Sequence, residues 1–230
     1  MPELHPMLVA RAPFADLPAA SAARRGVIVS DRDGLGLATV LARKGQSEAL
    51  AQRVRERFRI ELPQGSRRAT AGDVALAGTG PGAWLASCER GGNAFAVSLR
   101  ETIGDLAAVS DQSDGYAVLR LSGPGVRDTL CKLIPVDVHA RAFEVGDVAV
   151  TAAAHIGATL WRLEDYSPGS PIFEIAVFRS FAASFWRALS ESAAEFGFHE
   201  ARFDLSLARS QSHAAHTWST QAAGLENPST

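Results

Sequence analysis

The sequence predicts a mixed fold of strands and helices built as two halves. Its 230 residues are 47% hydrophobic, which is enough apolar material for one substantial core or two small ones. Short apolar or alternating runs, typical of strands, are interrupted by segments whose apolar residues recur every three or four positions, typical of helices. This succession occurs in residues 26–105 and again in outline in residues 106–205, so we expect two sheet-and-helix halves packed together.

The first half, residues 26–105, begins with two β-rich runs on either side of Asp33-Gly34, a dipeptide that favours a hairpin turn. A helix is predicted from Ser47, because Leu50, Val54 and Phe58 recur every four residues. A strand ending at Pro63, two short strands flanking Gly78–Gly82, and a helix over residues 92–103 complete the half.

The second half, residues 106–205, contains strands near residues 106–109 and 116–121, a Gly123–Gly125 turn, and a helix that carries Val126, Leu130, Leu133 and Ile134. Three strands follow, near residues 147–154, 156–163 and 171–178. The long final helix is expected to be capped by Ser180 and ended by Gly197. Its core-facing arc is expected to hold Phe181, Ala182, Phe185, Trp186, Leu189, Ala193 and Phe196.

The two ends differ from the halves in composition. Residues 1–25 form a Pro/Ala-rich extended lead with neither the basic start nor the apolar run of a signal peptide. Residues 206–230 are rich in Ser, Thr, Ala and Gln without sustained periodicity, so we expect a mobile tail, or an arm that orders on a partner.

The net charge and the cysteine content indicate which partners and which cellular compartment the sequence favours. The formal net charge is −2, with acidic and basic residues spread along the chain, which favours neither nucleic acid nor membrane as a partner. The uncharged run Val148–Trp161 contains His155 and is too short to span a bilayer, so we interpret it as strand that is buried or covered by a partner. With only two cysteines, the chain is expected to be cytoplasmic.

The Gly123-Pro124-Gly125 turn lies between a strand and a helix, where chains often hold phosphate. A dinucleotide fingerprint needs a third glycine, but Asp128 stands there, and Pro124 lacks an N–H that phosphate would use. The similar stretch Gly80–Ala86 lacks the lysine and serine of a P-loop. We expect neither turn to bind a nucleotide.

No other pattern predicts a site. His155 is interpreted as a hydrogen-bonded core or interface histidine, and Cys88 and Cys131 as small hydrophobic residues, because no activating base is adjacent. Loop or tail positions are expected for Asp31–Gly34, Asp111 with Asp114, Glu164-Asp165, and His213 with His216. We therefore assign no catalytic, cofactor-binding or metal-binding residue.

Longer stretches of the chain resemble a known family. Residues 108–143 (AVSDQSDGYAVLRLSGPGVRDTLCKLIPVDVHARAF), 154–165 (AHIGATLWRLED) and 173–197 (FEIAVFRSFAASFWRALSESAAEFG) are similar to the gamma subunit of heterotetrameric sarcosine oxidase. Upstream, Glu61–Pro63 and Gly80–Leu85 match the same pattern. The resemblance runs from about Gly26 to Gly197.

The resemblance implies an α+β fold like the folate-binding domain of the glycine-cleavage T-protein, an aminomethyltransferase. It also implies a heterotetramer in which alpha, beta and delta subunits hold FAD, FMN, NAD, tetrahydrofolate and zinc. There the larger subunits would convert sarcosine to glycine, hydrogen peroxide and 5,10-methylenetetrahydrofolate or formaldehyde. The gamma subunit would carry none of these cofactors and would serve by packing against its partners.

The chain departs from the wider folate-dependent family between Asp147 and Glu164, and it also lacks the lysine-glycine-cysteine signature of the folate-dependent iron-sulfur assembly relatives. That family uses an acidic residue in or near a Gly-Gly stretch after the second-half strands, but no acidic residue lies between Asp147 and Glu164. A cationic intermediate needs a fixed carboxylate or base beside it. We therefore expect a non-catalytic structural subunit. The alternatives are a free-standing tetrahydrofolate-dependent aminomethyltransferase-like protein, and a binding or regulatory module.

Overall fold

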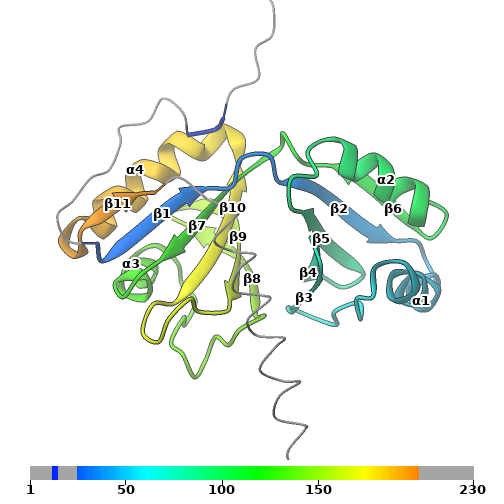
Figure 1. Cartoon of the computed structure of the whole chain (residues 1–230), viewed down its shortest axis with the longest axis horizontal. Coiled ribbons are helices and arrows are strands. Elements are labelled where there is room, and N and C mark those ends of the chain that lie inside the picture. The colour runs from blue at the N-terminus through cyan, green and yellow to red at the C-terminus, as the bar shows by residue number, and fades with distance from the viewer. Residues whose placement is uncertain (1–11, 15–24, 202–230) are drawn as a thin grey trace, which may run out of the picture.

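A computed structural model describes residues 12–14 and 25–201 and contains two β-sheets (Figure 1). The six-stranded sheet has the order β11-β1-β7-β10-β9-β8, and the five-stranded sheet has the order β3-β4-β5-β2-β6. All strand pairs are antiparallel except β1 with β11. The strands of the six-stranded sheet are β1 (Val27–Asp31), β7 (Tyr116–Ser122), β8 (Val148–Ala153), β9 (Ile156–Leu163), β10 (Ile172–Phe178) and β11 (Phe198–Glu200). Those of the five-stranded sheet are β2 (Gly36–Ala42), β3 (Arg68–Ala71), β4 (Val74–Gly80), β5 (Ala83–Cys88) and β6 (Ala107–Asp111).

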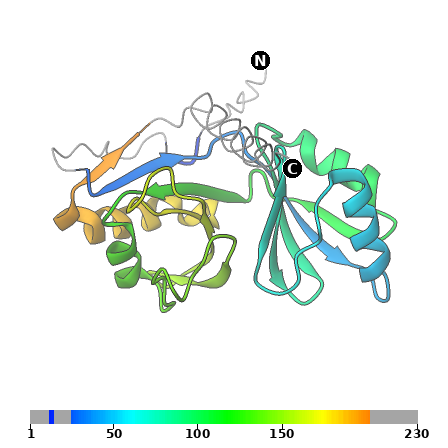
Figure 2. The ribbon, with the colours of Figure 1, turned by 60° about the horizontal axis from the view of Figure 1, so that its bottom comes forward.

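The elements form four layers, with the two sheets inside and helices outside (Figures 1 and 2). Helices α3 (Val126–Leu133) and α4 (Ala182–Ala193) pack on the six-stranded sheet through one apolar core. Helices α1 (Ser47–Phe58) and α2 (Ala94–Ile103) pack on the five-stranded sheet through a second core. Short 3-10 turns, Arg179–Phe181 and Ala194–Phe196, flank α4. None of the helices in the described residues is long and apolar enough to cross a membrane.

The two sheets face each other across a third, smaller apolar cluster. The five-stranded sheet contributes residues from β2, β4, β5 and the segment before β2, and the six-stranded sheet contributes residues from β7, β8, β9 and β10. The cluster consists of Leu35, Leu37, Ala77, Leu85, Val118, Val148, Trp161 and Ala176. We call the space between the facing sheets the seam, and it holds the candidate site described below.

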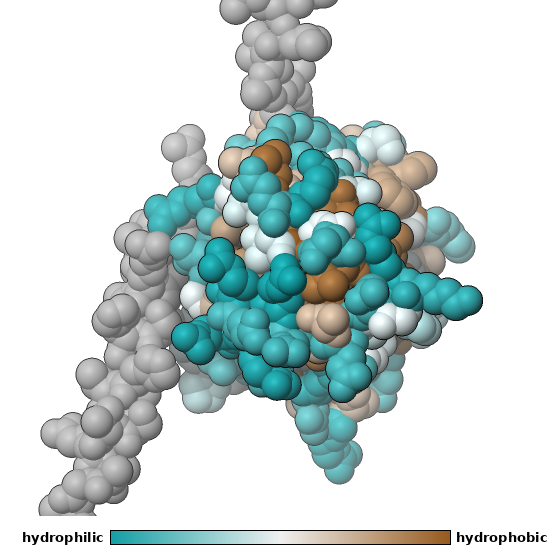
Figure 3. Space-filling model, turned by 90° about the vertical axis from the view of Figure 1, so that its right-hand side faces the viewer, coloured by the Kyte–Doolittle hydropathy of each residue, from teal (hydrophilic) through white to brown (hydrophobic). Residues whose placement is uncertain are grey.

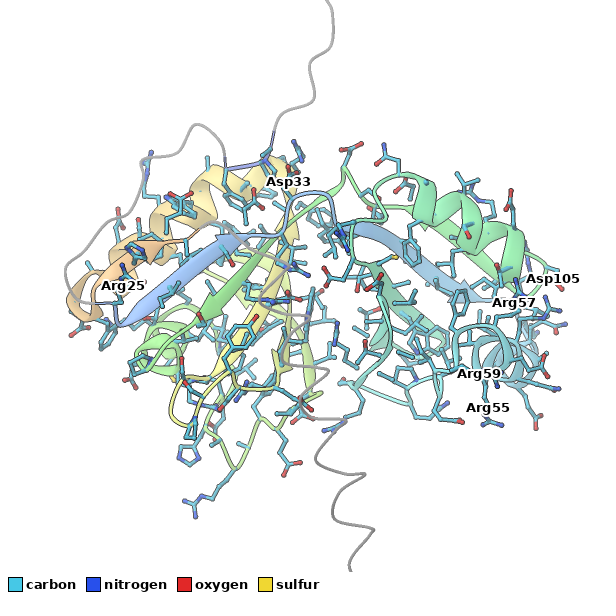
Figure 4. All side chains as sticks on the ribbon, viewed as in Figure 1. Arg25, Asp33, Arg55, Arg57, Arg59 and Asp105 are labelled. Atoms are coloured by element: carbon cyan, nitrogen blue, oxygen red, sulfur yellow. The ribbon has the colours of Figure 1, made fainter. Side chains whose placement is uncertain are left out.

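The first strand of each predicted half pairs with strands of the other half. Strand β1 lies in the six-stranded sheet, and strand β6 lies in the five-stranded sheet. Strand β1 pairs with β7 and β11, whereas β6 pairs with β2. The predicted hairpin at Asp33-Gly34 is therefore wrong: the turn exists, with Gly34 at φ 77°, but it carries the chain from one sheet to the other. Figure 4 shows Asp33 on this connection. The predicted ranges 26–105 and 106–205 thus differ from the two sheets by one strand each, and as domain boundaries they stay a prediction.

Several predicted elements agree closely with the structure. Helix α1 begins at Ser47 and buries Leu50 and Val54, and the final helix buries Phe185, Trp186 and Leu189. Gly197 ends that helical segment at φ 87°. The predicted tail, residues 206–230, and most of the lead, residues 1–25, lie outside the described residues, although Phe14 is buried with its ring 5.7 Å from that of Trp186.

Other predictions, of element ends and of the burial of single residues, were wrong. No strand ends at Pro63, because residues 59–64 are irregular, and Ser180 makes no capping hydrogen bond because a 3-10 turn comes before α4. This turn rotates Phe181 out of the core, so its side chain is 47% exposed. His155 is exposed in the two-residue turn between β8 and β9 rather than in a strand, and Cys131 is exposed on α3.

The Gly123–Gly125 turn is shaped by close packing of backbone. Gly123 has φ 114°, and a Cβ added there would lie 2.5 Å from the Gly26 carbonyl oxygen. The backbone N–H of Gly125 donates a 2.8 Å hydrogen bond to the same oxygen. A Cβ on Gly125 would lie 2.8 Å from the Cβ of Phe196. These glycines therefore permit the close approach of two chain segments.

The end of the molecule formed by α1 and α2 is mostly hydrophilic, with hydrophobic residues visible between polar ones (Figure 3). Val97 on α2 is 52% exposed. Single exposed apolar residues are ordinary on protein surfaces, so Val97 serves below as a control position.

Candidate functional site: an ion network between the sheets

Glu174 occupies the middle of the seam. It lies on β10, directly opposite Arg120 on β7 and Trp161 on β9. Residues paired across a sheet share a face, so the three side chains face the five-stranded sheet together with the apolar seam cluster. Among the described residues, Glu174 is the only acidic residue that is buried.

Both oxygens of the Glu174 carboxylate are occupied. Oε1 accepts hydrogen bonds from Arg32 Nε at 2.6 Å and from Arg120 Nε and Nη2 at 2.9 and 2.7 Å. Oε2 accepts a 2.8 Å hydrogen bond from the Trp161 indole N–H. Charge-assisted bonds of this kind are the strong ones in proteins.

Arg32 extends the network to the other sheet. It lies on the connection between β1 and β2, and its guanidinium also pairs with Glu89, which follows β5. The chain Glu174–Arg32–Glu89 therefore links the six-stranded sheet to the five-stranded sheet. Arg120 also donates a 2.7 Å hydrogen bond to the hydroxyl of Tyr166, at the solvent side of the network.

The arginines keep Glu174 ionised. Burial acts to raise the pKa of this carboxyl, but attraction from Arg120, Arg32 and Arg68 outweighs it and lowers the pKa from 4.5 to about 2. The pKa of Arg120 is raised, because attraction to Glu174 and Tyr166 exceeds the effect of its own burial. The Glu174 carboxylate is therefore ionised at neutral pH.

This arrangement suits a structural carboxylate better than a catalytic one. A general base needs a lone pair within reach of a substrate proton and a pKa near the working pH. The Glu174 oxygens are engaged by four protein donor groups, and the pKa lies far below neutrality. The site can hold two sheets together electrostatically.

Sequence reasoning missed this network. The family pattern indicates a carboxylate between Asp147 and Glu164, whereas Glu174 lies ten positions after Glu164, inside the otherwise apolar strand Ile172–Phe178. A single acid in a buried apolar strand is itself a signal, because such a charge must be paired. Which arginines pair with it depends on long-range strand order and could not be inferred from spacing.

The structure brings Cys131 and His155 together. Both line an open hollow of about 430 Å³ between α3 and the β8–β9 turn, with Lys132 and Pro135. No hydrogen bond joins the two side chains, and no group that would activate the thiol is contributed by the lining residues Leu133, Ile134, Ala152 and Ala154. Cys131 and His155 therefore line the same hollow, but their side chains do not form a catalytic pair.

The remaining candidates have local roles. Asp111 accepts two hydrogen bonds from Ser113, and Asp114 accepts one from Asn93, in the connection between β6 and β7. Asp165 pairs with the buried Arg162. Burial, with repulsion from Asp73 and Glu89, raises the pKa of Cys88. Within residues 12–14 and 25–201 no group of three or more His, Cys, Asp or Glu could hold a metal, and His213 and His216 lie outside the described residues.

Asp31 lies at the end of β1, beside the connection between the sheets. Burial and repulsion from Asp33 raise its pKa to about 6, against smaller opposing contributions from the Arg32 backbone N–H and from Arg179. Its Oδ1 atom is buried without a hydrogen-bond partner among the described residues. An adjoining hollow of about 20 Å³ is large enough for one water.

The fold defines the class of protein first. The chain shares its α+β fold with the glycine cleavage system aminomethyltransferase T from Bartonella henselae: the TM-score is 0.55 over 77% of this chain and 48% of that chain. At 14% identity this likeness shows the fold alone.

The sequence then defines the family. The profile of the "Sarcosine oxidase, gamma subunit family" matches residues 44–195. The chain belongs to this family, as the resemblance in its strand and helix motifs predicted.

Individual relatives agree with this assignment. The sarcosine oxidase subunit gamma of an Arthrobacter species is 34% identical over 108 residues, which are 46% of this chain and 53% of that protein. The subunit gamma of Corynebacterium sp. strain P-1 is 37% identical over 95 residues, 41% of this chain and 46% of that protein. The chain thus spans about half the length of the curated relatives it matches.

A solved structure extends the likeness over a longer stretch. A chain of the heterotetrameric sarcosine oxidase from Corynebacterium sp. U-96, in complex with pyrrole 2-carboxylate, matches with a TM-score of 0.69 at 26% identity. The match covers 81% of this chain and 96% of that chain.

Proposed function

We propose that this chain is a non-catalytic, structural gamma subunit of a cytoplasmic heterotetrameric sarcosine oxidase. In this proposal the alpha, beta and delta subunits carry FAD, FMN, NAD, tetrahydrofolate and zinc. They convert sarcosine to glycine with hydrogen peroxide and 5,10-methylenetetrahydrofolate or formaldehyde. The contribution of this chain is to pack against them and complete the assembly.

The observation that carries the proposal is the state of Glu174. It is the one buried acid of the described residues, and donors from Arg32, Arg120 and Trp161 occupy both its oxygens. A carboxylate held in this way neither accepts a substrate proton nor faces a cationic one-carbon intermediate without first losing these bonds. This supports packing over chemistry as the role of the chain.

The edge of the six-stranded sheet offers a surface for packing. Strand β8 is an outer strand, and its residue Val150 is 59% exposed. The run Val148–Trp161, which we predicted to be buried or covered by a partner, contains both kinds of strand. Ala158, Leu160 and Trp161 on β9 are buried within the chain, whereas β8 is the outer strand of its sheet. An exposed apolar edge strand is suited to cover by another chain.

Co-purification tests the proposal. A tag on this chain, expressed together with the companion subunits, is expected to recover flavin-bearing larger chains and sarcosine-dependent peroxide formation. The chain expressed alone is expected to give no peroxide and to retain no tetrahydrofolate. Turnover or folate retention by the isolated chain would overturn the proposal in favour of the aminomethyltransferase alternative.

A pair of matched variants tests the packing surface. Val150→Lys on β8 is expected to reduce recovery of the larger chains at least tenfold, because a lysine on an edge strand blocks strand or apolar contact. Val97→Lys on α2 makes the same change at a position of similar exposure and is expected to leave recovery unchanged. Equal recovery with both variants would exclude β8 as part of the interface.

A further inference from the structure

Strand β8 is the least protected of the four outer strands in the described part of the chain. Natural edge strands are kept short, charged or capped, because their unpaired N–H and C=O groups attract other strands. Strand β11 has three residues and ends in the exposed Glu200, and β3 has four residues and begins with Arg68. On β6, the Val109 carbonyl accepts a 3.2 Å hydrogen bond from the Arg100 guanidinium. Strand β8 has six residues, with neither a charge nor a proline among them.

The strand register shows which backbone groups of β8 are open. The two-residue turn to β9 is flanked by Ala153 and Ile156, and a turn of this length is closed by a hydrogen-bonded pair. The β8 backbone therefore bonds to β9 at Ala153 and at every second residue before it. The N–H and C=O groups of Val148, Val150 and Ala152 point to the outer side instead. No hydrogen bond from another described segment reaches the backbone of Val150 or Ala152.

Hydrogen bonds at the start of β8 agree with this alternation and show that the edge accepts a strand. The Asp147 carbonyl accepts a 3.0 Å bond on the inner side, from the Arg162 N–H. The Val148 N–H donates a 3.0 Å bond on the outer side, to the Ser66 carbonyl. The next residue, Arg67, pairs antiparallel with Asp147. One end of this edge is thus already extended by a short segment from the other half of the chain, and the rest is open.

Apolar surface surrounds the open stretch. Val150 and Ala152 share one face of β8 and are exposed. Gly157, opposite Ala152 on β9, leaves free space beside them, because a Cβ added there would meet no atom within 4 Å. Ala152 also lines the hollow of about 430 Å³ beside α3, whose walls include Leu133 and Ile134. Pockets of this size enclose small ligands, so the hollow has room for one large apolar side chain.

We propose that β8 accepts an extended, uncharged strand of a companion subunit, which adds to the six-stranded sheet beside Val150 and Ala152 and places one large apolar side chain in the hollow. This inference rests on the proposed function, which supplies the companion. Main-chain hydrogen bonds give such a contact its affinity, and alternate side chains give it specificity. The incoming strand is uncharged because the run Val148–Trp161 offers no Asp, Glu, Lys or Arg to pair with a charge.

A second copy of this chain fits the edge less well than a companion strand. In an antiparallel pairing of two β8 strands centred on Thr151, Ala154 of one copy comes opposite Val148 of the other. That place is already taken, because Val148 donates its N–H to Ser66 of its own copy. A companion strand is free to turn away before it reaches this point.

Val150→Pro tests strand addition, because it removes one open N–H and keeps the hydrogen bonds to β9. Edge strands tolerate proline at such positions, so the Tm of the isolated chain is expected to change by less than about 5 °C. Co-expressed with the companion subunits, this variant is expected to recover about tenfold less of the flavin-bearing chains, or fewer still. Val150→Thr is the matched control, because it keeps the N–H and the branched shape, and its recovery is expected within about threefold of wild type. Equal recovery with the two variants would overturn the proposal.

Hydrogen exchange in the wild-type protein gives a readout that does not depend on how the proline variant folds. In the isolated full-length chain, the Val150 and Ala152 amides are expected to exchange fast and the Thr151 amide, bonded to β9, slowly. In the assembled oxidase, exchange at Val150 and Ala152 is expected to slow by about 100-fold or more. Unchanged exchange at both residues in assembled enzyme would overturn strand addition and leave the proposed function intact, whereas failure of the chains to assemble would overturn both.

Cys131 reports on the hollow, because its exposed thiol lines it. Alkylation of Cys131, followed by mass spectrometry, is expected to be about tenfold slower in the assembled oxidase than in the isolated chain. Equal rates would overturn the placement of a side chain in the hollow. A dimer of the isolated chain that Val150→Pro dissociates would assign the edge to a second copy and would also overturn the proposal.

Discussion

Glu174→Gln should reveal how much the seam network contributes to stability. Lowering the pKa of this carboxyl from 4.5 to about 2 corresponds to about 3 kcal/mol of favourable interaction with the charged form. Removing one partner of a buried ion pair costs about 3–5 kcal/mol in other proteins. Against a total stability of about 5–15 kcal/mol, we expect Glu174→Gln to remain folded at pH 7 but to lose about 3 kcal/mol.

Urea unfolding followed by tryptophan fluorescence measures this loss. With a slope of about 2–3 kcal/mol per M, the unfolding midpoint should fall by about 1–1.5 M at pH 7. Because the pKa is lowered in the folded state, the contribution of Glu174 is present above the unfolded value of 4.5 and is lost as the pH falls toward 2. The difference between variant and wild type should therefore narrow between pH 5 and pH 3.

Glu61→Gln is the control, because it makes the same chemical change in an exposed pair with Arg55, at the end of the molecule away from the seam (Figure 4). It should unfold at the same urea concentration as wild type. The reasoning would be refuted by a loss at Glu174 below about 1 kcal/mol at pH 7, or by a difference that grows as the pH is lowered.

Four further substitutions have directions fixed by the structure. Asp31→Asn should stabilise by about 1–2 kcal/mol at pH 7.5, by about half as much at pH 5 and by little at pH 3, because a pKa raised from 3.8 to about 6 means that deprotonation disfavours the fold; an effect independent of pH in urea titrations would contradict this. Phe185→Ala should cost about 3–5 kcal/mol, measured as a lower urea midpoint, since this ring is fully buried, and a loss below 1 kcal/mol would contradict the core assignment. Gly78→Ala should lower Tm strongly because its Cβ would lie 1.9 Å from the Gly65 carbonyl oxygen, and an unchanged Tm in calorimetry would be evidence against that contact. Replacing Ala154-His155 by Asn-Gly should stabilise by about 1–2 kcal/mol, because both residues have positive φ; a lower Tm would exclude strain in this turn.

Local patterns predicted most of the elements, and long-range pairing accounts for the errors. Leu50 and Val54 on α1 and Phe185 on α4 are buried as their spacing indicated, because helix periodicity is a property of neighbouring residues. The run around Asp33-Gly34 has the residues of a hairpin, yet Arg32 donates its backbone N–H to Val118 in β7 and continues that sheet, while the next strand joins the other. Burial of the seam cluster determines which sheet each of these two strands joins, and the local sequence pattern carries no information about that burial.

The candidate site shows the same limit. The sequence contains a lone acid at Glu174 and arginines scattered over more than 80 positions, from Arg32 to Arg120. Strand order alone brings Arg120 and Trp161 to either side of Glu174. Family resemblance predicted the fold and the family, but it directed attention to residues 148–163, which contain no acid, and away from the carboxylate of Glu174 in the seam.

The most direct test of the account is turnover per flavin in the assembled oxidase carrying Glu174→Gln. If this chain serves by packing, the assembled fraction should have a kcat for sarcosine within about twofold of wild type, while the complex dissociates or unfolds more readily. A fall in kcat of about 100-fold or more in fully assembled enzyme, the size expected for loss of a general acid or base, would contradict the structural role.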